Sequence, residues 1–364
     1  MTATVPQKKS SRDARTERIP VAVLGATGSV GQRFVQLLEN HPWFRLHEVV
    51  ASERSAGKNY GDAADWRLDS LLPHSAAALV VKDLGVELES RLLFSGLDSS
   101  VAGDAEELYA KRGCVVVSNS RNHRMGDDVP LLIPEINPDH LAAIERQRAR
   151  RGGDGYIVTN PNCSTIGLAM AIAPLERRWG IDQLHTTTMQ AISGAGYAGV
   201  SSYAILDNVI PYISGEEEKI ETEPRKILGK WEKGRFVNAT FLISAQTNRV
   251  PVIDGHLMTI SLKFRGKKPT LEDIRKSIES FTGEPQRLLL PSAPERPLEY
   301  IDEPDRPQPR LDRDRGQGQT VSVGRLRACP LLDIRMVALV HNTIRGAAGA
   351  ALLNAELLEA KGLL

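Results

Sequence analysis

One cysteine of this 364-residue chain stands at a predicted junction between a strand and a helix. The β-like run 156–159 leads into Asn162 and Cys163, and a helical pattern follows over 168–178. The free N–H groups and the dipole at a helix N-terminus favour a thiolate over a thiol. Because the thiolate is the nucleophilic form, Cys163 is a candidate for covalent catalysis. The alternative is a small residue buried at the end of a strand.

Glycines near the N-terminus form a second candidate site. A predicted strand, 19–24, is followed by the spacing G-x-x-G-x-x-G and by a helical pattern over 29–40. Such glycines permit a tight turn and close approach of the backbone to pyrophosphate, which would rest on the helix N-terminus. An incidental glycine turn in an α/β domain is the alternative. The candidate cofactor contacts are Gly25, Thr27, Gly28, Ser29, Val30 and Gly31.

The end of the predicted second strand, 47–51, indicates which cofactor binds. An NAD enzyme usually carries an acidic residue there for the ribose hydroxyls. This chain instead has Ser52, Arg54 and Ser55, and two hydroxyls with a guanidinium suit a 2′-phosphate. We therefore predict NADP rather than NAD, with Glu53 either facing solvent or binding ribose.

His256 is the candidate acid/base that would act with Cys163. It follows a turn signal at 254–255 and opens a predicted strand, 256–265. It shares one face of that strand with Met258, Ile260, Leu262 and Phe264. Strand alternation therefore directs the imidazole toward the interior, at the end of a sheet. Histidine is the commonest side chain in catalytic proton transfer; a buried core histidine is the alternative.

Two further residues have the chemistry of a substrate site. Arg249 could bind a carboxylate through two parallel hydrogen bonds, although taken alone it also fits a surface arginine. Gln190 is a polar residue in an otherwise apolar predicted strand, 183–193, which leads into a glycine turn at Gly194. The position of Gln190 therefore suggests a site at the end of that strand.

Two polar segments could bind charged parts of a substrate. The basic loop 118–124 follows a predicted strand and could bind phosphate, or it could be an ordinary connection. Glu216, Glu217, Glu218 and Lys219 begin a predicted helix. Acidic residues are favoured at that end of a helix by its dipole, so helix-end chemistry is the alternative to substrate binding.

The pattern of elements predicts an α/β fold in two parts. Strands and helices alternate through the first 160 residues, which is typical of a parallel sheet with crossover helices. Long alternating runs after Cys163 indicate a mostly antiparallel sheet with one buried face. We expect a Rossmann-like NADP-binding domain at 19–160, completed by a C-terminal helix at 343–364. We expect an α+β catalytic and dimerisation domain at 161–342.

The sequence pattern also predicts the bounds of the individual strands and helices. Strands are expected at 19–24, 47–51, 91–95, 114–118, 156–159, 183–193, 240–247, 256–265 and 331–340. Helices are expected at 29–40, 104–112, 138–148, 201–213 and 216–228, and a long loop at 291–319.

The composition excludes several classes of protein. The chain has 46 Lys and Arg against 45 Asp and Glu, so we expect neither nucleic acid nor a membrane as partner. The cysteines at 114, 163 and 329 are odd in number and widely spaced, which fits neither a disulfide framework nor a metal site and favours a reducing cytoplasm. No apolar run reaches the ~18 residues of a membrane span. Residues 1–18 are polar and basic, which predicts a disordered tail rather than a secretory signal.

Together these motifs resemble the aspartate-β-semialdehyde dehydrogenase family, specifically its archaeal and fungal type. The matching segments are 25–31, 51–58, 118–125, 161–165, 189–196, 248–251, 254–256 and 342–349. They occur in the family's order and span most of the chain beyond residue 18. The resemblance implies NADP-dependent reductive dephosphorylation of L-aspartyl 4-phosphate to the semialdehyde, in synthesis of lysine, threonine and methionine. It also implies inorganic phosphate as a co-product and a homodimer or homotetramer.

The resemblance implies a role for each site residue. Cys163 looks like the thiolate that displaces phosphate and carries the acyl group, and His256 looks like the acid/base. Arg249 looks like the clamp on the α-carboxylate, and Gln190 like the residue that orients the acyl-enzyme. The remaining implied contacts are Glu216 for the substrate amine, with Glu217 or Glu218 as alternatives, Lys219 and Arg124 for phosphate, Asn162 for substrate, and Ser193, Gly194 and Asn342 for the cofactor.

Three other functions compete with this interpretation. Malonyl-CoA reductases are similar in sequence, but Arg249 with Glu216 favours an amino acid, because a glutamate serves no purpose for the two negative ends of malonate. Acetylglutamyl-phosphate reductases share the chemistry, but the loop 118–125 argues against them. A non-catalytic NADP-sensing protein would leave the set around Cys163 and His256 unexplained.

Overall fold

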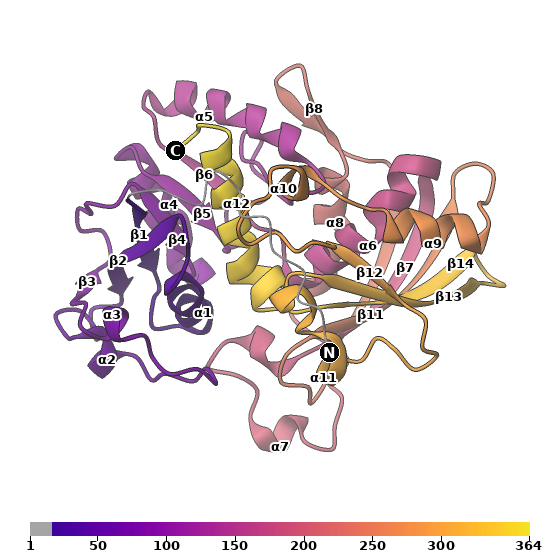
Figure 1. Ribbon diagram of the computed structural model, residues 1–364, viewed down its shortest axis with the longest axis horizontal. Coiled ribbons are helices and arrows are strands. Elements are labelled where there is room, and N and C mark those ends of the chain that lie inside the picture. Colours follow the sequence, from indigo (N-terminus) through magenta and orange to yellow (C-terminus); the bar gives the residue numbers. More distant parts are fainter. Residues whose placement is uncertain (1–16) are drawn as a thin grey trace, which may run out of the picture.

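The computed structural model describes residues 17–364, which form two six-stranded sheets with helices between and around them (Figure 1). Residues 1–16 of the expected tail lie outside the described residues. Arg18, the last residue of that expected tail, donates a hydrogen bond to the His41 carbonyl. Within residues 17–364, no helix combines the length and the apolar character needed to cross a membrane.

The first sheet is parallel throughout, in the order β3-β2-β1-β4-β5-β6. Its strands are β1 (Ile19–Leu24), β2 (Phe44–Ala51), β3 (Val81–Asp83), β4 (Leu92–Ser95), β5 (Val115–Ser118) and β6 (Tyr156–Thr159). The crossover helices are α1 (Ser29–Leu38), α4 (Ser99–Lys111) and α5 (Ala143–Arg151). Strands β4, β5 and β6 are buried along their whole length, which explains their continuous apolar sequences. The order confirms the predicted Rossmann-like fold.

The end of the chain returns to the first sheet. After a short π-helical turn (Ile344–Ala348), α12 (Gly349–Ala360) packs into the apolar cluster that contains the cores of β1 and β4. Figure 1 shows α12 in yellow against the indigo and purple strands. Small side chains such as Ala351 are completely buried there, which permits close packing. The Tyr156 hydroxyl donates to the Leu363 carbonyl and ties the C-terminus to β6.

The second sheet is mixed and mostly antiparallel, in the order β10-β7-β11-β14-β13-β12. Its strands are β7 (Ile181–Gln190), β10 (Leu242–Arg249), β11 (His256–Phe264), β12 (Leu298–Ile301), β13 (Val321–Ala328) and β14 (Ile334–Val340). The inner pairings are antiparallel, and the outermost pairing at each edge is parallel. Helices α6 (Cys163–Trp179) and α9 (Leu271–Glu279) bury apolar side chains against this sheet, and α8 (Glu216–Ile227) packs along β10.

The segment 201–213 differs from the predicted helix. Only α7 (Ser202–Ile205) is helical. Asp207 adopts a left-handed φ of 56°, which ends any continuation of the helix. Ile210 then forms an isolated bridge with Arg249, so the segment wraps along β10 instead of forming a second helical turn.

The sequence pattern also misses five strands. β3, β8 (Lys230–Glu232) and β9 (Arg235–Val237) have three residues each, too few for a periodic signal. β12 lies inside the predicted 291–319 loop, and β13 contains Arg325 with a left-handed φ of 59°, where the pairing register shifts. The remaining short elements are α2 (Tyr60–Ala63), α3 (His74–Ala77), α10 (Glu284–Arg287) and α11 (Pro309–Asp312).

Candidate active site

A cleft of about 680 Å³ is lined by residues of both halves of the molecule. It lies at the carboxyl ends of the first sheet's strands, where α/β folds bind ligands. Its lining includes Gly25, Thr27, Gly28, Ser29, Val30, Ser52, Arg124, Asn162, Cys163, Ser193, Gly194 and Asn342. Most cofactor candidates and the candidate nucleophile therefore share one cleft.

The glycine turn leaves its cleft side open. A Cβ added at Gly31 would lie 2.1 Å from the Gly25 carbonyl oxygen, so Gly31 allows α1 to pack on the turn. A Cβ added at Gly28 would contact only that same oxygen, at 3.4 Å. Gly28 is the N-cap of α1, so the first N–H groups of this helix are accessible from the cleft. A pyrophosphate fits this cradle.

The turn after β2 contributes Ser52 to the cleft, whereas Arg54 and Ser55 lie outside its lining. The Ser55 N–H donates to the Ser52 carbonyl at 2.8 Å and closes the turn. Arg54 is exposed at this rim. The three residues stay candidates for a 2′-phosphate, because a long exposed guanidinium can reach over the rim.

Asn342 joins two loops beside the cleft. Its Oδ1 accepts from the Gly255 N–H at 2.8 Å, and its Nδ2 donates to Ser193 Oγ at 2.7 Å. Both ends of the amide are thus engaged within the protein. Asn342 therefore shapes the cleft by fixing Ser193 and the turn that precedes His256.

Cys163 is the first residue of α6, which confirms the predicted strand-to-helix junction. Asn162 is the N-cap, and its Oδ1 accepts from the Ser164 and Thr165 N–H groups at 3.0 and 3.2 Å. A capped first turn fixes the direction of the helix and the place of its first side chain. Gly346 lies against it, because an added Cβ there would be 2.8 Å from the Cys163 Cβ.

The charge environment of Cys163 differs from the expectation based on the helix dipole alone. Burial raises the pKa of this thiol to about 12, and the Glu216 carboxylate adds to the effect. The cations that act in the opposite direction are Arg124, Arg249 and Lys219. The resting side chain is therefore a thiol near neutrality, and its activation depends on the groups that contact the sulfur.

His256 contacts that sulfur. Its Nε2 lies 3.2 Å from Cys163 Sγ, and its Nδ1 accepts from the Ala191 N–H at 3.0 Å. Because Nδ1 is an acceptor, the neutral ring carries its hydrogen on Nε2, facing the sulfur. Burial and then the charge of Arg249 lower the pKa of His256 to about 3. The ring is therefore neutral near pH 7 and presents a hydrogen-bond donor to the sulfur.

Glu216 anchors a polar network beside the nucleophile. Its two oxygens accept from Asn162 Nδ2 at 3.1 and 2.9 Å, and they also accept from Gln190 Nε2 at 3.2 Å and Lys219 Nζ at 2.6 Å. Burial opposes ionisation, but Lys219 and the two amides outweigh it and hold the pKa of Glu216 below its usual value. Glu216 is therefore a buried carboxylate that contacts Asn162, which lines the cleft.

The neighbouring acids of α8 lie elsewhere. Glu217 accepts from the Thr247 N–H of β10 at 3.1 Å, and Glu218 is exposed. Of the three acidic residues that open this helix, Glu216 is the one that contacts Asn162.

Gln190 and Arg249 end neighbouring parallel strands and are paired in register. Arg249 Nη1 donates to the Ala191 carbonyl at 2.6 Å. A Cβ added at Gly194 would lie 3.0 Å from that nitrogen and 3.3 Å from His256 Nε2. The guanidinium and the imidazole therefore both lie against Gly194, and a side chain at this position would crowd both groups.

Glu223 of α8 is a site residue that sequence reasoning missed. It is 2% exposed, and it accepts from Arg124 Nη1 at 2.9 Å and from the Asn162 N–H at 2.7 Å. Arg124 Nη2 donates to the Asn119 carbonyl at 2.7 Å. Helical periodicity could have found Glu223, because Glu216 and Glu223 are two turns apart on one face of the helix.

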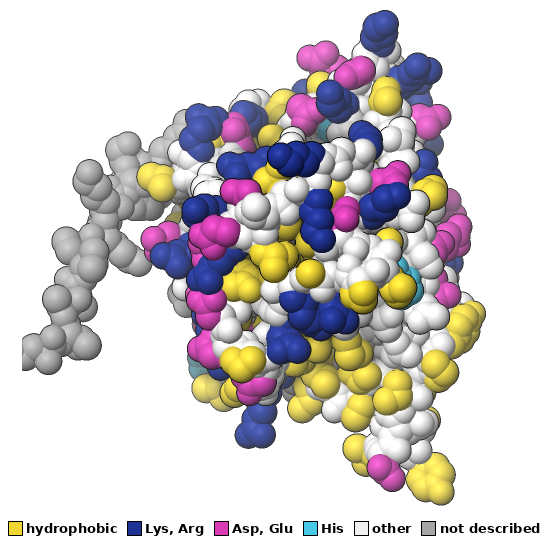
Figure 2. All heavy atoms as spheres, turned by 90° about the vertical axis from the view of Figure 1, so that its right-hand side faces the viewer, with side chains coloured by type: hydrophobic (Ala, Val, Ile, Leu, Met, Phe, Trp, Pro, Cys, Tyr) yellow, Lys and Arg dark blue, Asp and Glu magenta, His cyan; other side chains and the backbone are white. Residues whose placement is uncertain are grey.

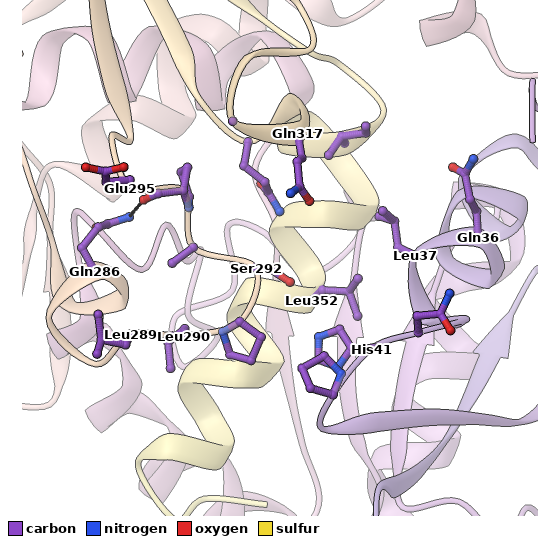
Figure 3. Close-up of a pocket in the computed structure, with 18 residues that line it drawn as sticks. Gln36, Leu37, His41, Gln286, Leu289, Leu290, Ser292, Glu295, Gln317 and Leu352 are labelled. Carbon is purple, nitrogen blue, oxygen red and sulfur yellow. Dashed lines mark hydrogen bonds between the residues drawn. The ribbon is translucent and has the colours of Figure 1, made fainter. Parts of the chain in front are cut away.

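A larger cavity, of about 890 Å³, lies away from these residues, between the end of α1, the segment 286–295 and α12 (Figure 3). At this cavity His41 Nε2 contacts Glu356 Oε1 at 2.8 Å, and the Ser292 N–H and hydroxyl donate to the same carboxylate. None of the site residues predicted from the sequence lines this larger cavity. Across residues 17–364, no group of three or more His, Cys, Asp or Glu is placed to hold a metal ion.

Comparison with known proteins identifies the family. Residues 20–144 match the family model described as semialdehyde dehydrogenase, NAD binding domain, and residues 172–345 match the dimerisation domain of the same family. The chain is 50% identical to an aspartate-semialdehyde dehydrogenase of Candida albicans, over 94% of this chain and 98% of that protein. It is 49% identical to one of Methanothermobacter thermautotrophicus, over 93% and 99% of the two chains.

Solved structures agree. The crystal structure of the Candida albicans aspartate-semialdehyde dehydrogenase with NADP superposes with a TM-score of 0.89 at 48% identity, over 96% of this chain and all of that one. Fold, cleft and sequence thus point to one family over nearly the whole length. The chain belongs to the aspartate-semialdehyde dehydrogenases.

Proposed function

We propose that this protein interconverts L-aspartyl 4-phosphate and L-aspartate 4-semialdehyde with NADP(H), through an acyl-thioester on Cys163, in the synthesis of lysine, threonine and methionine. One observation carries the proposal. Cys163 lines the same cleft as the glycine turn, and its sulfur lies 3.2 Å from Nε2 of the buried His256. A nucleophile beside a nucleotide cradle, with a donor to its sulfur, suits reductive displacement of a phosphate.

The cleft fits the cofactor. The open side of Gly28 and the N-terminus of α1 would hold the pyrophosphate, and the turn from Ser52 to Ser55 would bind the 2′-phosphate. Val30, Ser193 and Gly194 would continue the contact toward Cys163. When bound, NADPH supplies the hydride that converts the acyl group to the aldehyde.

The side chains account for the remaining chemistry. The Cys163 sulfur forms a bond to C4 of aspartyl phosphate, and the C–O bond to phosphate breaks, with its electron pair leaving on the phosphate. The proton of the thiol leaves with this phosphate, which is the base that the reaction itself supplies. Arg124 and Lys219 are the cations that would bind this leaving group. His256 Nε2–H would stabilise the thiolate and donate to the oxygen on the reacting carbon. Release of the aldehyde leaves the sulfur as a thiolate, which takes up a proton to restore the resting thiol.

The amino acid end of the substrate needs two opposite charges. Arg249 would bind the α-carboxylate, and the buried carboxylate of Glu216 would face the ammonium. Gln190 donates to Glu216 and would orient the acyl group, and Asn162 would contact the substrate beside the nucleophile. The Glu216 carboxylate also favours this substrate over malonyl-CoA, which carries no positive group.

We propose further that residues 19–160 with 343–364 bind NADP and that 161–342 form the catalytic and dimerisation domain.

The exposed apolar side chains of the 201–213 segment support a homo-oligomer interface beside β10. They are Tyr203, Leu206, Val209 and Tyr212. Figure 2 shows apolar side chains gathered toward the lower end of the face that it displays. Sedimentation would distinguish homodimer from homotetramer, and Tyr212→Glu should shift either toward monomer.

The free cysteines at 114, 163 and 329 favour a cytoplasmic location.

One assay tests the function. Formation of NADPH from aspartate semialdehyde, phosphate and NADP is measured against oxidation of NADPH with malonyl-CoA. We expect turnover only in the first reaction. Turnover only with malonyl-CoA would assign the cleft to the related reductases.

A further inference from the structure

Helix α8 presents buried charged residues to the loop that carries Arg124. Glu223 and Lys226 are 2% and 3% exposed, although the helix is polar overall. The helix belongs to the half that contains the second sheet, whereas Arg124 follows β5 of the first sheet. The contacts of these two residues therefore join the two halves at the active site.

Glu223 bridges two functional groups with one carboxylate. Oε1 accepts from Arg124 Nη1 at 2.9 Å, and Oε2 accepts from the Asn162 N–H at 2.7 Å. Asn162 directly precedes Cys163. Both oxygens of Glu223 are engaged within the protein, and the side chain is 2% exposed and does not line the cleft. It connects the guanidinium with the peptide that precedes the nucleophile.

Lys226 fixes the same loop from its backbone. Its Nζ donates to the carbonyls of Arg124, Gly126 and Val129, each at 2.8 Å. The ammonium also lies 4.2 Å from the centre of the Phe236 ring, a favourable cation–π contact. All three ammonium hydrogens are thus used, so Lys226 anchors the loop and Glu223 sets the direction of the Arg124 side chain.

We propose that Glu223 is a positioning residue, which holds Arg124 and the peptide before Cys163 at a fixed separation. The proposal rests on the function given above, in which Arg124 binds the phosphate that Cys163 displaces. A phosphate held by Arg124 is then kept at a fixed place relative to Cys163 in the cleft that both residues line, and such preorganisation is a large part of catalytic rate.

Glu223→Gln tests this role. The amide keeps the shape but has one acceptor and one donor, so either Arg124 or the Asn162 N–H faces another N–H group. Loss of the charged hydrogen bond should raise the KM for phosphate, in the direction that oxidises semialdehyde, on the order of tenfold. The kcat should fall, alkylation of Cys163 by iodoacetamide should change rate, and the Kd for NADP should stay the same.

Glu356→Gln is the matched control, because it makes the same change on a buried carboxylate that His41 and Ser292 bind. Both of these partners line the remote cavity (Figure 3). It should lower the melting temperature and leave the KM for phosphate of the folded protein unchanged. Equal kinetic effects of the two variants would overturn the positioning role. So would failure of both Glu223→Gln and Glu223→Asp to fold, since the residue would then serve stability alone.

Arg124→Ala separates this inference from the proposed function. If Arg124→Ala leaves the KM for phosphate unchanged, both the phosphate role of Arg124 and the positioning role are overturned. If Arg124→Ala raises this KM and Glu223→Gln does not, only the positioning role fails. We expect both to raise it, and the double variant to be no worse than Arg124→Ala, because Glu223 acts on phosphate through that guanidinium.

Discussion

The two ends of the cleft are built from different parts of the chain. The part of the cofactor end that would hold the pyrophosphate is backbone, consisting of the glycine turn and the N-terminus of α1. The substrate end is a set of side chains already bonded to one another, centred on Glu216 and Glu223. Burial of these carboxylates is offset only because each has several donors.

Because of this difference, the two ends of the cleft have different functions. A backbone cradle binds any nucleotide phosphate of suitable shape, whereas a fixed network of charges selects one substrate and one reaction. Substitutions at the substrate end should therefore change turnover and leave cofactor binding intact, and substitutions at the cofactor end should do the reverse. The following experiments test that separation, from the largest expected effect to the smallest.

Cys163→Ala should abolish turnover and preserve the fold and the Kd for NADP, because no other group can carry the acyl thioester. Steady-state rate, melting temperature and cofactor titration on one preparation measure all three. Substantial activity in the folded variant would end the covalent mechanism.

His256→Asn should lower kcat by ~10²–10⁴-fold, the usual contribution of a positioned proton donor or acceptor. Asparagine can still accept from the Ala191 N–H but places a weaker donor near the sulfur. Cofactor affinity should be unchanged. A large fall in melting temperature with full turnover in the folded fraction would make His256 a core residue instead.

Arg249→Lys should lower kcat/KM for the semialdehyde by roughly 10- to 100-fold although the charge is kept. An ammonium cannot make the planar two-bond contact with a carboxylate, and a charged hydrogen bond contributes about 1.5–3 kcal/mol. Kinetics with phosphate varied at saturating semialdehyde serve as control. Wild-type kcat/KM would place Arg249 outside the substrate site.

Replacing Ser52, Arg54 and Ser55 together by Ala should weaken NADP binding about tenfold and leave NAD binding nearly unchanged, because only NADP carries the 2′-phosphate. Fluorescence titration with each cofactor measures both affinities on the same variant. Equal losses for the two cofactors would show that this turn does not distinguish them.

Glu216→Gln should speed alkylation of Cys163 near pH 8 by a few-fold while lowering turnover. The Glu216 charge raises the pKa of the Cys163 thiol, so its removal increases the thiolate fraction at a given pH. Glu217→Gln on the same helix is the control, because Glu217 bonds Thr247 instead. An alkylation rate equal to that of Glu217→Gln would remove Glu216 from the environment of the sulfur.

Sequence reasoning succeeds where local pattern and chemistry coincide. The apolar runs of β1 and β6, the glycine turn and the junction at Cys163 each carry their signal within a few residues. The family match supports the NADP-dependent function that these motifs predict. By contrast, β3 has only three residues, and β12 lies within the 291–319 stretch whose composition predicts a loop. The 201–213 segment has a helical composition that Asp207 interrupts through its backbone conformation.

The substrate network could not be predicted as a network. Apart from the Glu216–Lys219 ion pair, its contacts join residues far apart in the chain, such as Glu223 with Arg124 and Glu216 with Gln190. A glutamate in a polar helix looks like a solvated residue until the partner across the fold is known. The thiol of Cys163 illustrates the same limit, because burial outweighs the local helix effect.

The placement of α12 has a consequence for how the protein is made. The strands of the first sheet are all synthesised by residue 159, yet Leu353 and Leu357, which are buried in their apolar cluster, leave the ribosome only after β14 of the second sheet. Part of this sheet's apolar face is therefore uncovered while the whole second sheet is being translated. Exposed apolar surface on a nascent chain promotes aggregation. The yield of active protein should thus depend on translation speed and chaperone supply, even where the finished enzyme is stable.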